Sequence, residues 1–305
     1  MDKIIITTGD PNGIGAEITM KALKALNLPK EKIAIISNKK ILNYYRKLDK
    51  NYEIIEIPYN ENDIKVGQVT KEAGEFSFQS LKLACELKPK AIVTAPVAKN
   101  ALHLAGHNFN GQTEVLQHFL AHDNQLAEML FVANGFRVLL LTRHCALKEI
   151  TLTQDVVVTK IKNLVKTFQK QFSINNPKFA LCGFNPHSGE DGILGREEID
   201  ILIPAVQELQ NAKIDITMPL PADTLFVDAA KNYLKNTKDK YDCYIANYHD
   251  QGLIPIKTVA GENTVNMTIG LDIVRTSPGH GTAFDIAGKN IASPNGMIAA
   301  IKEVL

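Results

Sequence analysis

Short apolar runs rich in β-branched residues alternate with longer amphipathic stretches, and this alternation constrains the fold more than any other feature. The first run, KIIITT at 3–8, precedes a stretch in which Ile14, Ile18, Ala22 and Leu26 share one helical face. Strands are predicted at 3–8, 32–37, 52–57, 91–96, 128–134, 136–142, 178–185, 214–220, 241–248 and 265–270, and helices near 38–48, 70–88, 153–170 and 196–210. Strands that alternate with helices favour an α/β fold with a mostly parallel sheet.

Length and charge restrict the class of protein. The chain has 305 residues, which suggests two domains or one large α/β body with a cleft. Its 34 basic and 33 acidic residues give a formal charge of +1, and nucleic-acid-binding proteins usually carry a clear basic excess. The sequence shows neither a secretory leader nor an apolar run of about 20 residues. We therefore expect a cytoplasmic protein that binds neither nucleic acid nor membrane.

The cysteine pattern excludes a zinc finger and a disulfide scaffold. None of the four cysteines forms a C-x-x-C pair, and each lies in or beside an apolar run. We expect Cys85, Cys145, Cys182 and Cys243 to be buried, reduced thiols.

Three of the eight histidines follow apolar strands. His144 follows VLLLTR, His187 follows FALCGFNP, and His249 follows CYIANY. In open α/β sheets, ligands bind at the carboxyl ends of the strands. Three imidazoles with an open coordination position suit catalytic Zn²⁺ or another borderline divalent ion. Any one of these histidines, taken alone, is more often a loop or packing residue, but three at equivalent positions point to a shared metal site.

Charged and polar residues near these histidines could complete a site. Asp250 and Asp223 could orient a histidine, join a metal or act as a base, and Asp223 could alternatively cap a helix. Lys257, Asn266 and Arg275 follow the third histidine at regular spacing around strand-like segments. They could clamp a phosphate or carboxylate, or they could be solvated surface residues.

The glycine-rich loop at 9–17, GDPNGIGAE, lies between a predicted strand and a predicted helix. Its glycines would allow close approach to an anion at the helix N-terminus. It matches neither the G-x-G-x-x-G dinucleotide motif nor the lysine-containing phosphate loop. A plain tight turn is the alternative interpretation.

Taken together in order, these segments resemble a known family. The motifs are GDPNGIGAE, LTRHCALKEI, CGFNPHSGEDG, PADTLF, NYHDQGL, VNMTIGL and IVRTSPGHGTAFDIAGK. They resemble the 4-hydroxythreonine-4-phosphate dehydrogenase family of vitamin B6 biosynthesis, from Gly9 to beyond Gly288. The tail HGTAFDIAGKNIASP also resembles the cofactor-binding signature of isocitrate and isopropylmalate dehydrogenases.

The resemblance implies a two-lobed α/β/α isocitrate/isopropylmalate dehydrogenase-like fold. The active site would lie in the interdomain cleft at a dimer interface, with the metal histidines shared between the subunits of a homodimer. Residues 1–118 and 277–305 would form a first lobe that holds both termini and the cofactor segment. Residues 119–276 would form a second lobe with the metal histidines and the dimer contacts.

The resemblance also assigns roles to residues. These are His144, His187 and His249 for a divalent metal ion (Zn, Co, Mg or Mn); Gln112, Thr113, Lys257, Asn266 and Arg275 for the substrate; Asp223, Asp250 and Lys257 for catalysis; and His280, Gly281 and Thr282 for NAD or NADP. Gln112 stands where the family motif usually has histidine. Glutamine can form hydrogen bonds there but cannot carry a proton or a charge.

The implied activity is the NAD(P)- and metal-dependent oxidation of 4-phosphooxy-L-threonine to 2-amino-3-oxo-4-phosphooxybutanoate. This product would decarboxylate to 3-amino-1-hydroxyacetone phosphate, a step in pyridoxal 5'-phosphate biosynthesis. One alternative is a related dehydrogenase of another phosphorylated or acidic hydroxy compound, which the glutamine at 112 favours. A non-catalytic metabolite-binding protein is the other.

Overall fold

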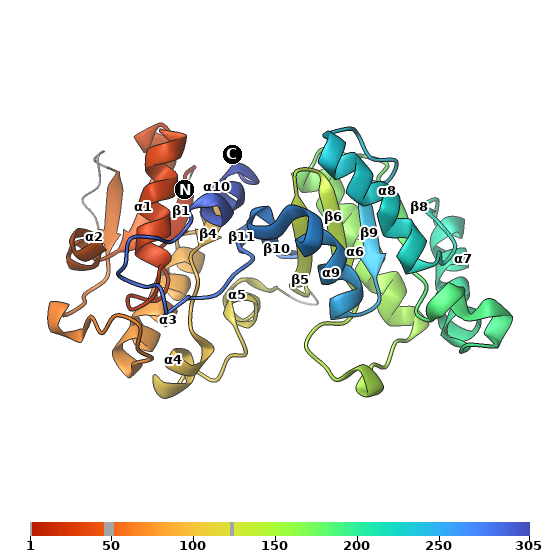
Figure 1. The fold of residues 1–305 in the computed structure, drawn as a ribbon, viewed down its shortest axis with the longest axis horizontal. Helices are drawn as coiled ribbons and strands as arrows, with labels where there is room; N and C mark the ends of the chain where they lie inside the picture. The colour runs from red at the N-terminus through yellow and green to blue at the C-terminus, as the bar shows by residue number, and fades with distance from the viewer. Residues whose placement is uncertain (1, 46–51, 123–124) are drawn as a thin grey trace. The chain divides into compact units, whose positions relative to one another are not determined.

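The computed structural model describes residues 2–45, 52–122 and 125–305, and it divides into two compact units (Figure 1). The first unit consists of Met1–Ala127 and Val265–Leu305, and the second is Glu128–Thr264. Within the described ranges, no helix combines the length and apolar character needed to cross a membrane.

The first unit is built on a mainly parallel sheet in the order β3-β2-β1-β4-β11-β10. Its strands are β1 (Ile4–Thr7), β2 (Ile33–Ser37), β3 (Glu53–Glu56), β4 (Ala91–Thr94), β10 (Val265–Ile269) and β11 (Val274–Pro278). All neighbouring pairs are parallel except β10 and β11, which are antiparallel. The last segment of the chain is therefore inserted beside β4, far from it in sequence.

Both faces of this sheet are buried, because alternate residues of each strand point to opposite faces. Ile4 and Ile6 belong to one apolar core, and Ile5 belongs to another. The helices of this unit are α1 (Gly15–Leu26), α2 (Lys39–Tyr45), α3 (Lys71–Glu86), α4 (Lys99–Leu104), α5 (Gln112–Leu120) and α10 (Asn295–Lys302). Residues of α1 and α10 fill the first core, and residues of α3 and α5 fill the second.

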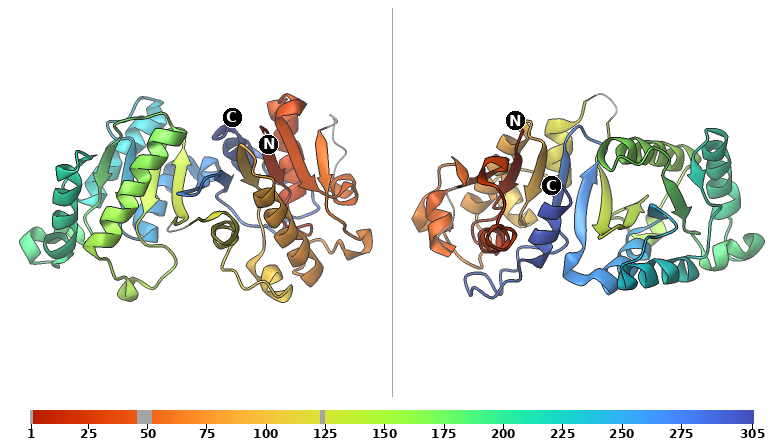
Figure 2. Two further views of the ribbon diagram at one scale, coloured as in Figure 1. Left: turned by 180° about the vertical axis from the view of Figure 1, so that it is seen from behind. Right: turned by 90° about the horizontal axis from the view of Figure 1, so that it is seen from above.

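The second unit has a sheet in the order β5-β6-β9-β7-β8. Its elements are β5 (Glu128–Ala133), β6 (Phe136–Leu140), α6 (Gln154–Gln171), β7 (Lys178–Leu181), α7 (Ile203–Asn211), β8 (Asp215–Ile216), α8 (Ala222–Lys235), β9 (Cys243–Ala246) and α9 (His249–Ala260). The pair β5 and β6 is antiparallel, whereas β6, β9, β7 and β8 are parallel. Figure 2 shows α6 and α8 on opposite faces of this sheet.

The unit boundaries differ from the expected lobes at 118/119 and 276/277. Residues 119–127 and 265–276 belong to the first unit. The cause is the β10–β11 hairpin, whose second strand pairs with β4 and so places both strands in the first sheet.

Several local expectations also need correction. Lys257 lies on helix α9 rather than near a strand, and the strand expected at 214–220 is only Asp215–Ile216. Of the helix expected at 38–48, the part after Tyr45 falls largely outside the described residues. Cys145 is exposed, whereas the other three cysteines are buried as expected.

Candidate functional site

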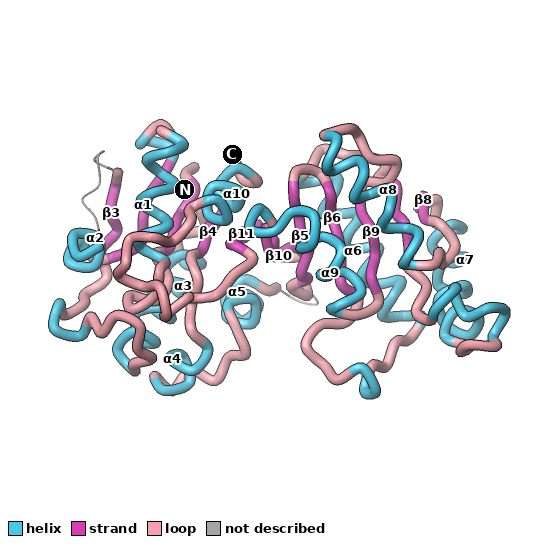
Figure 3. Tube along the Cα trace, viewed as in Figure 1, coloured by secondary structure: helices cyan, strands magenta, loops and turns pink. Residues whose placement is uncertain are grey.

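The three predicted metal histidines follow three neighbouring strands of the second unit. His144 lies in the long loop after β6, drawn as a pink tube in Figure 3, and His249 is the first residue of α9 after β9. His187 lies in the segment after β7. Because β6, β9 and β7 are adjacent and parallel, all three loops leave the same edge of the sheet.

Two of these histidines lie side by side. The ring centres of His144 and His249 are 5.5 Å apart. Two imidazoles bound tetrahedrally to one zinc ion through nitrogen at about 2.0–2.1 Å would have their ring centres about 5 Å apart. The spacing of the two rings is therefore close to that of two imidazoles on one ion.

Asp250 orients one of the two rings. Its Oδ1 lies 2.7 Å from Nδ1 of His249, so the ring can donate Nδ1–H to the carboxylate. A carboxylate at one ring nitrogen is the usual way to fix the tautomer of a metal-binding histidine. Nε2 of His249 is then the nitrogen with a lone pair for a ligand.

Asn247 ties the three loops together at the sheet edge. Its carbonyl oxygen accepts from the Thr142 hydroxyl at 2.7 Å, and its side-chain amide donates to the Cys182 carbonyl at 2.8 Å. The side chain of Gln251, on α9, donates to the Gly183 carbonyl at 2.7 Å and accepts from the backbone N–H of Asn247 at 2.7 Å. Buried and partly buried hydrogen bonds thus fix the relative positions of the loops.

His187 does not join the pair. In the part of the chain that the structure describes, no three histidine, cysteine, aspartate or glutamate side chains are placed to hold one metal ion. His187 is exposed, and so is Asp223 in the first turn of α8. Asp223 is not a helix cap, because the N-cap position is Pro221. Helix α8 packs against the Pro186–Gly192 segment that carries His187.

The predicted substrate residues divide between the two units, since Lys257 is exposed on α9 and the other four lie in the first unit. Arg275 is 3% exposed. Its Nε donates to the Thr94 hydroxyl at 2.8 Å and its Nη1 faces the Thr268 hydroxyl at 3.5 Å. Burial lowers the pKa of Arg275 to about 9, so the guanidinium is still charged near neutral pH.

This buried cation is not neutralised by an ion pair within the described residues, and Glu114 provides only a weaker favourable field. A buried charge without a counter-charge is costly. An anionic ligand such as a phosphate would supply that counter-charge.

Gln112 and Asn266 present hydrogen-bond acceptors near the same end of the sheet. Gln112 begins α5, and its Nε2 donates to the carbonyl of Ala95, directly after β4, at 3.2 Å. Asn266 pairs with Ser277 across the β10–β11 hairpin. Gln112 Oε1 and Asn266 Oδ1 are both buried, and neither has a partner among the described residues. Thr113 is buried beside Gln112.

Of the three predicted cofactor residues, Thr282 packs against the glycine-rich N-terminal loop. The Thr282 carbonyl accepts from the Ile14 amide at 3.1 Å, and a Cβ on Gly13 would come within 3.0 Å of that carbonyl. His280 and Gly281 are exposed. The loop at 9–17 is therefore a tight turn that also anchors the C-terminal segment.

Asn12 and Glu17 extend this anchor. The fully buried Asn12 accepts from the Lys65 amide at 2.7 Å and donates to the Gln68 carbonyl at 3.0 Å. Glu17 accepts from Lys21 at 2.7 Å and from the Ala292 amide at 2.9 Å.

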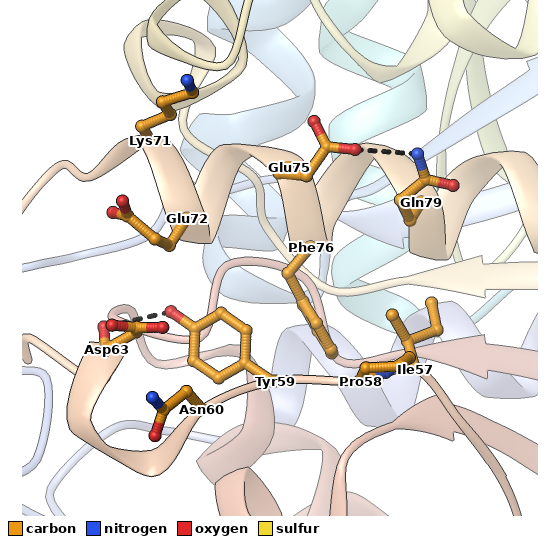
Figure 4. Close-up of a pocket in the computed structure, with 10 residues that line it drawn as sticks. All are labelled: Ile57, Pro58, Tyr59, Asn60, Asp63, Lys71, Glu72, Glu75, Phe76 and Gln79. Atoms are coloured by element: carbon orange, nitrogen blue, oxygen red, sulfur yellow. Dashed lines mark hydrogen bonds between the residues drawn. The ribbon is translucent and has the colours of Figure 1, made fainter.

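A separate cavity of about 340 Å³ lies between α3 and the segment before it (Figure 4). Its walls carry Lys71 and three carboxylates, those of Asp63, Glu72 and Glu75. None of the residues predicted from the sequence lines it. Its excess of negative charge does not suit a phosphorylated ligand.

The chain matches the family model of the "Pyridoxal phosphate biosynthetic protein PdxA" over residues 3–304. It is 40% identical to a 4-hydroxythreonine-4-phosphate dehydrogenase of Synechocystis sp., an alignment that covers 99% of this chain and 94% of the relative. A crystal structure of the enzyme of that name from Klebsiella pneumoniae superposes with a TM-score of 0.86 at 32% identity, over 100% of this chain and 98% of that one. A Salmonella typhi protein provisionally named D-threonate 4-phosphate dehydrogenase is 36% identical over 98% of this chain and 97% of its own length.

The fold extends to more distant dehydrogenases. Isocitrate dehydrogenase of Methylococcus capsulatus matches with a TM-score of 0.52 at 14% identity, over 99% of this chain and 85% of that one. At this identity the match supports the fold alone, which agrees with the isocitrate/isopropylmalate dehydrogenase-like architecture expected from the sequence.

Proposed function

Since the chain belongs to the family of the pyridoxal phosphate biosynthetic protein PdxA, we propose that it oxidises 4-phosphooxy-L-threonine with NAD or NADP and a divalent metal ion. The product, 2-amino-3-oxo-4-phosphooxybutanoate, would lose CO₂ to give 3-amino-1-hydroxyacetone phosphate. The observation that carries this proposal is the buried Arg275, whose charge no ion pair among the described residues neutralises. It is suited to the phosphate of such a substrate.

Further polar groups at the same end of the sheet match the rest of the substrate. The buried acceptors on Gln112 and Asn266 require donors, and the substrate has an ammonium group and a hydroxyl. Thr94 orients the guanidinium by accepting a hydrogen bond from Nε of Arg275. We assign phosphate binding to Arg275, with Thr113, Lys257 and Asn266 as further substrate residues.

We assign the metal ion to His144, His187 and His249, and the 5.5 Å spacing of the first and last rings supports this assignment. A bound divalent ion would supply Lewis acidity at the substrate oxygen. Asp250 holds the Nδ1 proton of His249, so one of its oxygens is already engaged. Its other oxygen remains available, so we assign proton transfer from the substrate hydroxyl to Asp223, Asp250 or Lys257, all exposed side chains of the second unit.

The nicotinamide would accept the hydride. We assign its binding to the segment with His280, Gly281 and Thr282, which the N-terminal loop holds in place through Ile14. We further propose a homodimer in which the partner subunit supplies the third histidine ligand, since His187 does not reach the other two within one chain.

A second candidate is the oxidation of D-threonate 4-phosphate, the substrate in the name of one close relative. This compound has a hydroxyl where 4-phosphooxy-L-threonine has its amino group. The unpartnered oxygen of Gln112 can accept a hydrogen bond from either group. It is therefore compatible with D-threonate 4-phosphate as well as with 4-phosphooxy-L-threonine.

A substrate panel tests the proposal. The purified protein, loaded with Zn²⁺, Co²⁺, Mg²⁺ or Mn²⁺, would be assayed by NAD(P)H absorbance with 4-phosphooxy-L-threonine, D-threonate 4-phosphate and their dephosphorylated forms. We expect turnover with the first compound and little without the phosphate. Faster turnover of D-threonate 4-phosphate would select the second candidate, and tight binding without any turnover would indicate a metabolite-binding protein.

A further inference from the structure

The backbone that carries His187 is left-handed at five consecutive residues. From His187 to Asp191, φ lies between 42° and 83°, and only one of the five residues is glycine. L-amino acids disfavour this region, and such segments persist only where surrounding contacts hold them. Contacts from outside these five residues must therefore hold this turn.

The carboxylate of Glu198 makes the contacts at its start. Glu198 is 3% exposed. Its Oε1 accepts from the Asn185 amide at 2.8 Å, and its Oε2 accepts from the Asn185 side chain at 2.9 Å. The Asn185 carbonyl in turn accepts from the Ser188 amide at 3.1 Å. Both oxygens of one buried carboxylate thus fix the residue from which the turn begins.

The turn is packed directly against this carboxylate. A Cβ on Gly189 would lie 2.7 Å from Glu198 Oε2, and a Cβ on Gly195 would lie 2.4 Å from Asn185 Nδ2. Both glycines also have positive φ, at 83° and 134°. The two glycines, Asn185 and Glu198 therefore form one interlocked unit around the His187 turn.

We propose that Glu198 is a positioning residue for the metal site: it holds the left-handed turn that presents His187. This inference rests on the proposed role of His187 as a metal ligand. A carboxylate can accept both bonds from Asn185, whereas an amide in its place can accept only one and sets its own donor against the other. Removing the charge should therefore release the turn without altering any ligand.

Glu198→Gln tests this, with Asp200→Asn as the matched control. Asp200 undergoes the same carboxylate-to-amide change two residues later, but it is exposed and bonds to the exposed Arg196. Zn²⁺ and Co²⁺ affinities would be measured by competition with a chromogenic chelator. We expect affinity about tenfold or more lower in Glu198→Gln, in the range of losses seen when groups that support metal ligands are changed. Asp200→Asn should match the wild type.

Hydrogen exchange of peptides spanning 185–195 gives a readout independent of metal. We expect faster exchange in Glu198→Gln and no change in Asp200→Asn, with circular dichroism showing both folded. Should Glu198→Gln fail to fold, Asn185→Ala removes the side-chain bonds to Glu198 and Glu197 but keeps the backbone bond to Glu198, and it is expected to show a change in the same direction. A folded Glu198→Gln with wild-type exchange and metal affinity would overturn the inference. A wild-type protein that binds no metal would instead refute the proposed function.

Discussion

Asp10 is a carboxylate that the fold buries almost completely, at 1% exposure. Its Oδ1 accepts from the Asn12 amide at 2.9 Å, while Oδ2 is buried without a partner among the described residues. Burial raises the pKa of Asp10 to about 6, and the bonds from the backbone amides of Asn12 and Ala98 lower it only in part. The residue therefore stabilises a turn at the cost of a buried charge at neutral pH.

This predicts a pH-dependent effect of Asp10→Asn. The pKa in the folded protein exceeds the unfolded value of 3.8, so the protonated form contributes stability that is present below about pH 4 and lost as pH rises through about 6. The rise of this pKa from 3.8 to about 6 corresponds to about 3 kcal/mol of unfolding free energy. The free energy of unfolding of Asp10→Asn, measured in urea, should therefore rise relative to that of the wild type between about pH 4 and 6 and then level off. Parallel pH profiles for the two proteins would contradict this.

Gln112 shows how one substitution in a family motif alters the chemistry offered to a ligand. Its amide nitrogen donates one hydrogen bond to the Ala95 carbonyl, and its buried oxygen has no partner among the described residues. Gln112→Ala should raise KM for the phosphorylated substrate by up to about tenfold, the value of one hydrogen bond. Gln112→His should stay within a few-fold of wild type near neutral pH, and exposed His118→Ala on the same helix is the control. An unchanged KM and kcat in Gln112→Ala would remove this residue from the substrate site.

At the scale of elements, the sequence predicts the strands better than the elements that complete the site. The runs at 3–8, 32–37 and 91–96 contain the observed β1, β2 and β4, because buried parallel strands need little beyond continuous apolar residues. Helix α9 was missed because it contains Gly252 and Pro255, which usually interrupt helices. Gly252 is there for packing, since a Cβ would lie 2.6 Å from the Leu140 side chain.

The strand pattern predicts that the three histidines lie at the carboxyl ends of their strands. It does not predict the hydrogen bonds that hold their loops in place. Asn247 contacts Cys182, and Glu198 contacts Asn185, through pairings that only the folded chain creates. A sequence can indicate that a polar residue ends an apolar strand. It cannot show which carbonyl that residue reaches.

Helix α1 contacts the C-terminal segment, and we expect that weakening this contact impairs cofactor binding. Glu17 is 1% exposed and holds the Ala292 amide at 2.9 Å, and Lys21 donates to the Asn290 and Ala292 carbonyls at 3.0 and 2.9 Å. Glu17→Gln should raise KM for the dinucleotide up to about tenfold with a smaller change in kcat, because it loosens a binding segment away from the reacting atoms. Glu31→Gln, an exposed control, should have no effect. A loss confined to kcat would argue against this role.

At the scale of the whole molecule, the proposed metal site could be completed by one chain or by two. His144 and His249 are adjacent in one chain, and His187 is apart from them. If a partner subunit supplies one of the three ligands, two of the three pairwise mixtures of His→Ala variants should regain activity. The adjacency predicts that the mixture without rescue is His144→Ala with His249→Ala.

Random exchange would make about half of the dimers mixed, with one intact site in each, and so restore roughly a quarter of wild-type activity. Exchange would be verified by mass spectrometry of differently tagged chains. Rescue in none of the three mixtures would place all three ligands in one chain.

Metal reconstitution tests the central claim, that three histidines hold one ion needed for oxidation of the phosphorylated substrate. Metal-free protein would be titrated with Zn²⁺ or Co²⁺ while bound metal and the rate of NAD(P)H formation from 4-phosphooxy-L-threonine are recorded together. We predict that the rate rises in proportion to bound metal and levels off at one ion per chain, and that His144→Ala, His187→Ala and His249→Ala each lose both metal and rate while remaining folded. Full turnover by the metal-free protein, or by a variant lacking all three histidines, would contradict the account.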